Sequence, residues 1–175
     1  ARKALLEQQG IEVEVFITEC DETHSFTDPH QVVEELAKRK LERFIELNPD
    51  YRLPTLACDT LISFNKKLIG KPSTRQEAYR QLASFSAKAQ QVHSGWAMWY
   101  KNRVISGADK ALVIFKPLDH RTIEQYLDTG QYKGAAGSYR IQGSARALID
   151  HIEGDEATVI GLPLLQISEI LSVPL

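Results

Sequence analysis

Cysteine is scarce in this sequence, and long hydrophobic runs are absent. The chain of 175 residues has two cysteines, Cys20 and Cys58, which lie far apart and form no C-x-x-C pair. This spacing argues against a disulfide scaffold or a zinc ribbon and favours a reducing compartment, so we expect a cytoplasmic protein. No apolar run approaches the roughly 20 residues that span a bilayer, and the sequence has no secretion signal.

The sequence also lacks an excess of charge of either sign. The formal net charge is −2, and acidic and basic residues are interspersed. Such a chain has no overall field that would recruit nucleic acid or a membrane surface, so we expect neither as a partner. The five histidines show no metal-ligand spacing. Hydrophobic residues make up 43% of the chain, which is enough for a real core.

The hydrophobic pattern predicts alternating helices and strands in a compact α/β domain. Asp28-Pro29 is a helix start, because the aspartate suits the cap and the proline the first turn. Helices are predicted over residues 1–9, from Asp28, from Ser73 (as the cap) to about 85, over 121–128 and 144–151, and after 163. Strands are predicted over residues 11–18, in a hairpin within 53–71, over 89–100 and 103–115, and over 158–160.

Asp59 lies inside a run, 56–64, that otherwise reads as a buried strand. A carboxylate there is costly unless a cation or a metal meets it. The chain returns through Asn65-Lys66-Lys67 to Lys71 on the partner strand. A three-residue loop would place Lys71 on the same sheet face as Asp59, whereas a two-residue loop would place it opposite Thr60 on the other face.

Lys40 falls on the apolar face of the helix that starts at Asp28. It follows Leu36 by four residues and precedes Phe44 by four, whereas Lys38 and Arg39 point elsewhere. The position suits either a lysine that extends its ammonium past the rim of the core or a phosphate ligand.

Six short strings follow one another along the chain. They are Asp21-Glu22, L-A-x-x-K at 36–40, Asp59-Thr60, Gly70-Lys71-Pro72, Ile141-Gln142-Gly143 and G-L-P-L at 161–164. Singly each string is weak, but together they cover nearly the whole chain, and in this order and at these spacings they resemble the Maf family of nucleotide pyrophosphatases.

The resemblance implies an α/β fold with an elongated mixed β-sheet, flanking helices and two lobes around a nucleotide cleft. It implies cleavage of non-canonical, modified or pyrimidine nucleoside triphosphates to the monophosphate and pyrophosphate, with Mg or Mn. A homodimer is also implied. The alternative is a non-catalytic Maf-like protein that binds a nucleotide or a partner and regulates septum formation.

The resemblance also assigns site residues. Catalysis is assigned to Asp59, Glu22 and Lys71, and metal binding to Glu22 and Asp59. Substrate and phosphate binding is assigned to Arg2, Lys40, Thr60, Lys71 and Gln142. Such a set fits the cleavage of a phosphoanhydride, which needs a metal, cations for the leaving pyrophosphate, and a carboxylate that holds the metal or activates water.

The chain departs from the family pattern in two places. Members usually begin with a strand and S-x-S-P-R-R; here Arg2 matches the second arginine and Ala1 stands at the first. We therefore expect residues 1–175 to form one Maf-like domain that lacks the first strand and this start. The usual D-K-A-G reads Gly134-Ala135-Ala136-Gly137. Asp59-Thr60 resembles the branch that takes dTTP and UTP, whereas 153–165 resembles the 7-methyl-GTP branch, so the base preference stays open.

Overall fold

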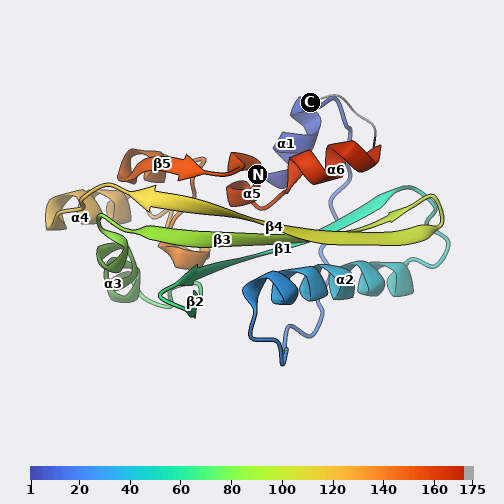
Figure 1. Ribbon diagram of the computed structural model, residues 1–175, viewed down its shortest axis with the longest axis horizontal. Helices are drawn as coiled ribbons and strands as arrows, with labels where there is room; N and C mark the ends of the chain where they lie inside the picture. The colour runs from blue at the N-terminus through green and yellow to red at the C-terminus, as the bar shows by residue number, and fades with distance from the viewer. Residues whose placement is uncertain (172–175) are drawn as a thin grey trace. The chain divides into compact units, whose positions relative to one another are not determined.

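The computed structural model describes residues 1–171 and contains a five-stranded β-sheet flanked by helices (Figure 1). The strands lie in the order β2-β1-β3-β4-β5, and neighbouring arrows in Figure 1 point in opposite directions. The predicted α/β fold with a helix-flanked sheet is confirmed; the sheet, expected to be mixed, is antiparallel in its described strands. The strands are β1 (Thr55–Phe64), β2 (Lys67–Ile69), β3 (Ala89–Tyr100), β4 (Arg103–Phe115) and β5 (Ile149–Glu153).

Six α-helices accompany the sheet within residues 1–171, and each of them is too short or too polar to span a lipid bilayer. They are α1 (Arg2–Gln8), α2 (Pro29–Leu47), α3 (Arg75–Phe85), α4 (His120–Asp128), α5 (Glu156–Ile160) and α6 (Leu164–Leu171). Two 3-10 turns, η1 (Ala136–Ser138) and η2 (Ser144–Leu148), lie between α4 and β5.

The two tight hairpins follow directly from their loop residues. Lys101 and Asn102 join β3 to β4 with φ values of 49° and 60°, as the sequence predicts. Asn65 and Lys66 join β1 to β2 with φ values of 50° and 62°, and Phe64 pairs with Lys67. Two residues with positive φ match the right-handed twist of the flanking strands. The β1–β2 loop therefore has two residues. Of the two loop lengths that the sequence left open, the shorter one is observed.

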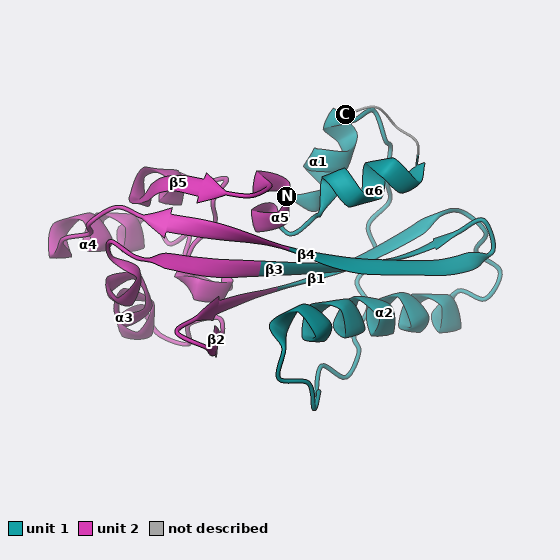
Figure 2. Ribbon diagram, in the orientation of Figure 1, with its two compact units in different colours: residues 1–60, 93–109, 161–175 teal, residues 61–92, 110–160 magenta. Residues whose placement is uncertain are grey.

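The described residues divide into two compact units (Figure 2). Of the described residues, unit 1 comprises 1–60, 93–109 and those from 161 onward, and unit 2 comprises 61–92 and 110–160. In unit 1, α2 covers one face of the sheet and α1 and α6 lie on the other (Figure 1). The expected nucleotide cleft and the single-domain assignment stay predictions.

Unit 2 has a core of aromatic rings that contact one another. Phe85 lies with its ring centroid 5.1 Å from that of Phe64 and 5.3 Å from that of Phe115, and Phe115 lies 5.3 Å from Tyr139. In unit 1, α2 rests on the sheet through smaller side chains, Ala37 and Leu41 against Ala97. A Cβ added at Gly95 would lie 2.2 Å from the carbonyl carbon of Val33, so a glycine is required where the helix meets β3.

Several sequence-based predictions of local structure were wrong. Residues 11–18, expected as a strand, pair with no strand in the described chain; Phe16 instead packs 5.0 Å from the ring of Phe44. Residues 158–160 belong to helix α5 rather than a strand, and residues 144–151 form η2 and the start of β5 rather than a helix. Helix α3 is capped by Thr74, whose side chain accepts from the Glu77 amide, and not by Ser73.

Candidate active site

Asp59 is a buried carboxylate in the middle of β1, as the sequence predicts, with 8% of the residue exposed. Its Oδ1 atom accepts a hydrogen bond of 2.5 Å from the Nζ atom of Lys40. Lys40 reaches the strand because α2 turns its apolar face, with Ala37 and Leu41, toward the sheet. The ion pair offsets the cost of burying the carboxylate.

Glu22 joins this pair from the loop that precedes α2. Its Oε1 atom lies 3.0 Å from Lys40 Nζ, and 63% of its side chain is exposed. The loop is fixed locally, since Arg39 Nη1 donates to the Thr23 carbonyl at 2.5 Å and Arg39 Nε donates to Glu35 at 2.9 Å. Arg39 was not singled out from the sequence, because its acceptor in the loop is a backbone carbonyl and leaves no sequence signature.

The charges of this cluster favour a protonated lysine. Burial by itself lowers the pKa of Lys40, but the hydrogen bonds to Asp59 and Glu22 outweigh burial and raise it above its ordinary value. Lys40 therefore carries a full positive charge at neutral pH.

Asp59 and Glu22 fit a metal that is shared with a substrate better than a metal held by protein alone. Among residues 1–171, no group of three or more His, Cys, Asp or Glu side chains is placed to hold an ion. Mg²⁺ in nucleotide enzymes takes one or two carboxylates and completes its shell with phosphate oxygens and water. The donor set is consistent with that arrangement.

Arg2 and Thr60, both predicted to bind substrate, contact each other. Arg2 Nη2 donates to Thr60 Oγ1 at 2.9 Å, and Thr60 Oγ1 also lies 3.0 Å from Ser94 Oγ on β3. Arg2 donates further to the carbonyls of Gly161 and Cys58. Ser94 was missed from the sequence; its only signal is the neighbouring Gly95, a glycine inside a strand.

Lys71 and Gln142 belong to unit 2, and both are exposed. Lys71 lies two residues beyond Ile69, where the pairing of β2 with β1 ends. Within residues 1–171 neither side chain makes a hydrogen bond or an ion pair. The loop of Gln142 is tight, since a Cβ on Gly143 would lie 2.0 Å from Gln131 Oε1. In unit 1 the structure therefore brings Glu22, Lys40 and Asp59 together and, separately, Arg2 and Thr60, whereas in unit 2 Lys71 and Gln142 contact neither group through a hydrogen bond or ion pair within the described chain.

Cys58 is a buried thiol next to Asp59. Burial raises its pKa to about 11, so it stays protonated at neutral pH. This environment is that of a small buried hydrophobe and not of a nucleophile.

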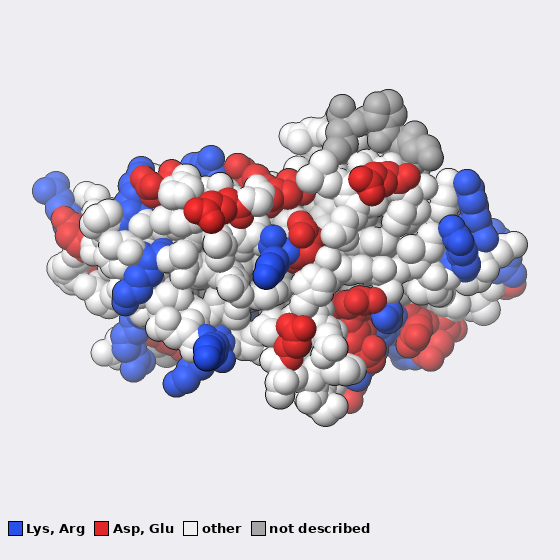
Figure 3. All heavy atoms as spheres, in the orientation of Figure 1, with Lys and Arg blue, Asp and Glu red and all other residues white. Residues whose placement is uncertain are grey.

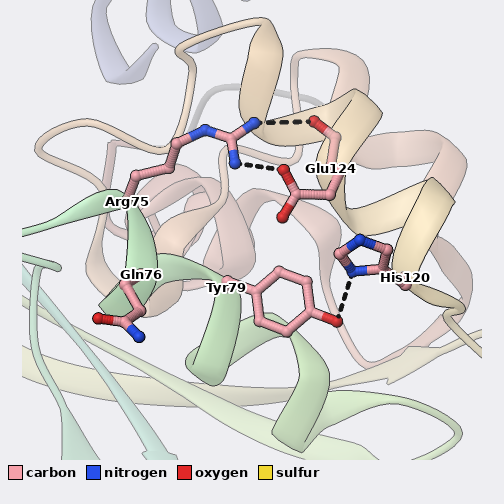
Figure 4. A pocket seen from close by; sticks show the side chains of 5 residues that line it. All are labelled: Arg75, Gln76, Tyr79, His120 and Glu124. Atoms are coloured by element: carbon pink, nitrogen blue, oxygen red, sulfur yellow. Dashed lines mark hydrogen bonds and ion pairs between the residues drawn. The ribbon is translucent and has the colours of Figure 1, made fainter.

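A separate hollow of about 470 Å³ lies between α3 and α4 in unit 2 (Figure 4). Its charged groups pair with each other, since Arg75 contacts both Glu124 and Asp128. Tyr79 OH and His120 Nδ1 lie 3.0 Å apart across it. None of the predicted site residues lines this hollow.

Comparison with known proteins connects the chain to one family. Residues 1–173 match the sequence model of the Maf-like proteins. A dTTP/UTP pyrophosphatase of Bacillus thuringiensis subsp. konkukian (strain 97-27) is 34% identical over 164 residues, which cover 93% of this chain and 85% of the relative. The dTTP/UTP pyrophosphatases of Bacillus anthracis (strain CDC 684 / NRRL 3495) and Bacillus cereus (strain AH820) are each 33% identical with the same coverage.

Proposed function

This chain belongs to the Maf-like protein family, and on that premise we propose that it is a nucleoside triphosphate pyrophosphatase. It hydrolyses the bond between the α and β phosphates and releases the nucleoside monophosphate and pyrophosphate. The observation that carries the proposal is the contact of a buried strand carboxylate, Asp59, with Lys40 and, through it, with Glu22. Perturbed, buried charges of this kind are common at functional sites.

We propose that Asp59 and Glu22 hold a divalent metal together with the phosphates of the substrate. The metal, Mg or Mn, supplies positive charge that neutralises the phosphates and polarises the bond that breaks. The carboxylate of Asp59 is suited to this task because β1 fixes its backbone, whereas Glu22 comes from an exposed loop. The difference in burial favours Asp59 as the rigid ligand and Glu22 as the adjustable one.

Two lysines, Lys40 and Lys71, are proposed to bind the triphosphate. Lys40 is a full positive charge beside the two carboxylates, so a phosphate oxygen can replace a carboxylate as its partner when the nucleotide binds. Within residues 1–171 the polar ends of Lys71 and Gln142 are exposed and make no hydrogen bond or ion pair. Lys71 is thus available to the β and γ phosphates, and Gln142 to the nucleotide or to metal-bound water. Their roles are supported by the G-K-P and I-Q-G motifs of the family.

The base preference is proposed from the relatives. The relatives named above are dTTP/UTP pyrophosphatases, and Asp59-Thr60 agrees with that branch. We therefore propose dTTP and UTP as the preferred substrates, ahead of 7-methyl-GTP. The cytoplasmic location and the homodimer remain proposals from the sequence and the family, and light scattering tests the latter. A link to septum formation has no support among the contacts described.

The test is pyrophosphate release from dTTP, UTP, CTP, 7-methyl-GTP and ITP, with Mg²⁺ or Mn²⁺ and with EDTA as the metal-free control. We expect release from dTTP and UTP that stops with EDTA. Equal release from every nucleotide would contradict the base preference only. Binding of nucleotide without release from any of them would contradict the enzyme and favour a binding protein.

A further inference from the structure

Arg2 forms hydrogen bonds with both sequence neighbours of Asp59 in strand β1. Its Nη1 atom donates to the carbonyl of Cys58 at 3.0 Å, and its Nη2 atom donates to Thr60 Oγ1 at 2.9 Å. Cys58 and Thr60 are the two neighbours of Asp59 in β1. The planar guanidinium thus spans the residues on either side of the proposed metal ligand, a contact that only a fixed fork of donors makes.

The third contact ties this segment to the chain before α6. Arg2 Nε donates to the carbonyl of Gly161 at 2.7 Å. Gly161 has a φ of +105°, and a Cβ on it would lie 2.8 Å from Thr60 Oγ1 and 3.0 Å from Arg2 Nε. A glycine therefore permits the close approach that this hydrogen bond requires. Each of the three guanidinium nitrogens of Arg2 therefore donates a hydrogen bond to a protein acceptor.

Arg2 and Lys40 contact opposite faces of β1. Side chains alternate along a strand, so Asp59 points away from Thr60. The two sets of contacts agree: Asp59 meets Lys40 from α2, whereas Thr60 meets Arg2 from α1 and Ser94 from β3. In unit 1, α1 and α2 lie on different faces of the sheet (Figure 1). The Arg2 guanidinium is thus placed against the back of the strand and not in the Lys40–Asp59–Glu22 cluster.

We infer that Arg2 is a positioning residue that fixes the backbone of β1 around Asp59, and not a phosphate ligand. Its catalytic consequence rests on the proposed pyrophosphatase activity, but its structural consequence does not. When Arg2 is removed, the strand at residues 58–60 loses two hydrogen bonds, the bond to Gly161 is lost as well, and the Asp59 carboxylate loses its fixed position. A displacement of about 1 Å at a reacting centre costs roughly 100-fold in rate.

The test compares Arg2→Met, which keeps the length of the side chain and removes its donors, with Lys3→Met as the matched control. Lys3 is a cation on the same helix, and it pairs with Glu7 at 3.6 Å. Three quantities are measured: amide hydrogen exchange of the peptide covering residues 57–61, kcat and KM for dTTP, and the affinities for dTMP and for an α,β-imido analogue of dTTP.

For Arg2→Met we expect exchange at residues 58–60 to be at least about tenfold faster, because the strand opens locally more often. We expect kcat to fall about 10- to 100-fold, with KM and both affinities within about threefold of the parent. Arg2→Lys is expected to behave like Arg2→Met, because one ammonium does not span the three acceptors. Lys3→Met is expected to leave all three quantities unchanged.

A phosphate ligand would give a different result. A tenfold or greater loss of affinity for the imido analogue relative to dTMP, with exchange unchanged, would overturn the inference, as would rescue by Arg2→Lys. If Arg2→Met does not fold, Thr60→Val removes one acceptor and should accelerate exchange at 58–60 to a smaller extent; unchanged exchange would also overturn it. If the parent protein binds but does not hydrolyse dTTP, the proposed function fails while the exchange comparison still decides the role of Arg2.

Discussion

Unit 1 holds an ion pair in its interior, where Lys40 meets Asp59, whereas unit 2 holds ion pairs on its surface, where Arg75 meets Glu124 and Asp128. The buried contact of α2 with the sheet in unit 1 is made by Ala37, Leu41 and Ala97, while the core of unit 2 contains a set of contacting aromatic rings. On the face shown in Figure 3, acidic and basic side chains are scattered without a field of one sign.

The difference indicates that unit 1 keeps buried charges that contribute little to the stability of the fold. A buried ion pair adds little to stability compared with apolar residues of the same volume, so its presence calls for another explanation. Exposed pairs such as those of Arg75 contribute little in either direction. Packing therefore accounts for the core of unit 2, whereas the buried ion pair of unit 1 is consistent with the function proposed for its charges.

The sharpest test of this contrast removes the buried charge. Asp59→Asn is expected to lower the rate of pyrophosphate release by more than about 100-fold, because a metal ligand supplies several kcal/mol of transition-state stabilisation. The fold and nucleotide binding should be largely retained, since asparagine has nearly the same shape. Steady-state kinetics and circular dichroism measure the two effects.

The matched control is Asp50→Asn, which removes a fully exposed carboxylate from the same unit. We expect unchanged kinetics for this variant. Full activity in Asp59→Asn would contradict the assignment of Asp59, and equal losses in both variants would show that the rate depends on the charge of unit 1 in general.

A second test addresses how α2 is seated. Gly95→Ala places a methyl group 2.2 Å from the backbone of Val33, so α2 must shift and carry Lys40 with it. We expect the free energy of unfolding in urea to fall by about 1–3 kcal/mol, together with a loss of activity. Gly70→Ala in unit 2 is the comparison, since a Cβ there has no atom within 4 Å; its effect should stay within about 0.5 kcal/mol.

If Gly95→Ala were as stable as the parent protein, the close contact with β3 would not be what seats α2. Activity adds one further outcome. A stable but inactive variant would mean that the helix has moved without a large cost, and that the position of Lys40 is decisive.

Much of this arrangement was predictable where local patterns decide it. The β3–β4 hairpin and helix α2 were predicted from long regular patterns and from Asp28-Pro29. Lys40 was placed on the sheet-facing side of α2 by its spacing from Leu36 and Phe44, and Asp59 in a buried strand by its apolar neighbours. In each case the signal lies within a few residues of the feature.

The contacts that were missed depend on residues far apart in sequence. Arg2 binds backbone carbonyls 56 and 159 residues away, and a carbonyl carries no residue identity. Residues 11–18 alternate as a strand should, but a strand forms only where another strand pairs with it, and none in the described chain does. Residues 158–160 are a short apolar run, for which periodicity does not separate helix from strand.

The third test concerns an exposed cation of unit 2. Lys71→Ala is expected to weaken binding of a triphosphate about tenfold and binding of the monophosphate much less, because Lys71 is proposed to contact the β and γ phosphates. Isothermal titration with the imido analogue of dTTP and with dTMP measures both affinities. Lys67→Ala, four residues earlier in strand β2, is the matched control. Equal losses for the two ligands would mean that Lys71 does not contact the β and γ phosphates.

The smallest effect is expected at the helix caps, which both units share. Asp119 caps α4 in unit 2 by accepting from the Thr122 amide at 2.7 Å, and Asp28 caps α2 in unit 1 by accepting from the His30 amide at 3.1 Å. Replacing either aspartate by alanine should lower the melting temperature by about 2–4 °C. Thermal unfolding followed by circular dichroism measures both shifts.

The cap of α4 also has a predicted pH dependence. Hydrogen bonds from the side chain and amide of Thr122 hold the pKa of Asp119 below its ordinary value. A carboxyl whose pKa is lowered by folding stabilises the protein above its unfolded pKa of about 4, and this stabilisation is lost as the pH falls through the folded pKa. The difference in melting temperature between the parent and Asp119→Asn should therefore shrink as the pH falls below about 4. A constant difference would contradict a charge-dependent cap. Similar shifts in melting temperature for Asp28→Ala and Asp119→Ala would show that the caps act alike in the two units, so that the units differ in their interiors only.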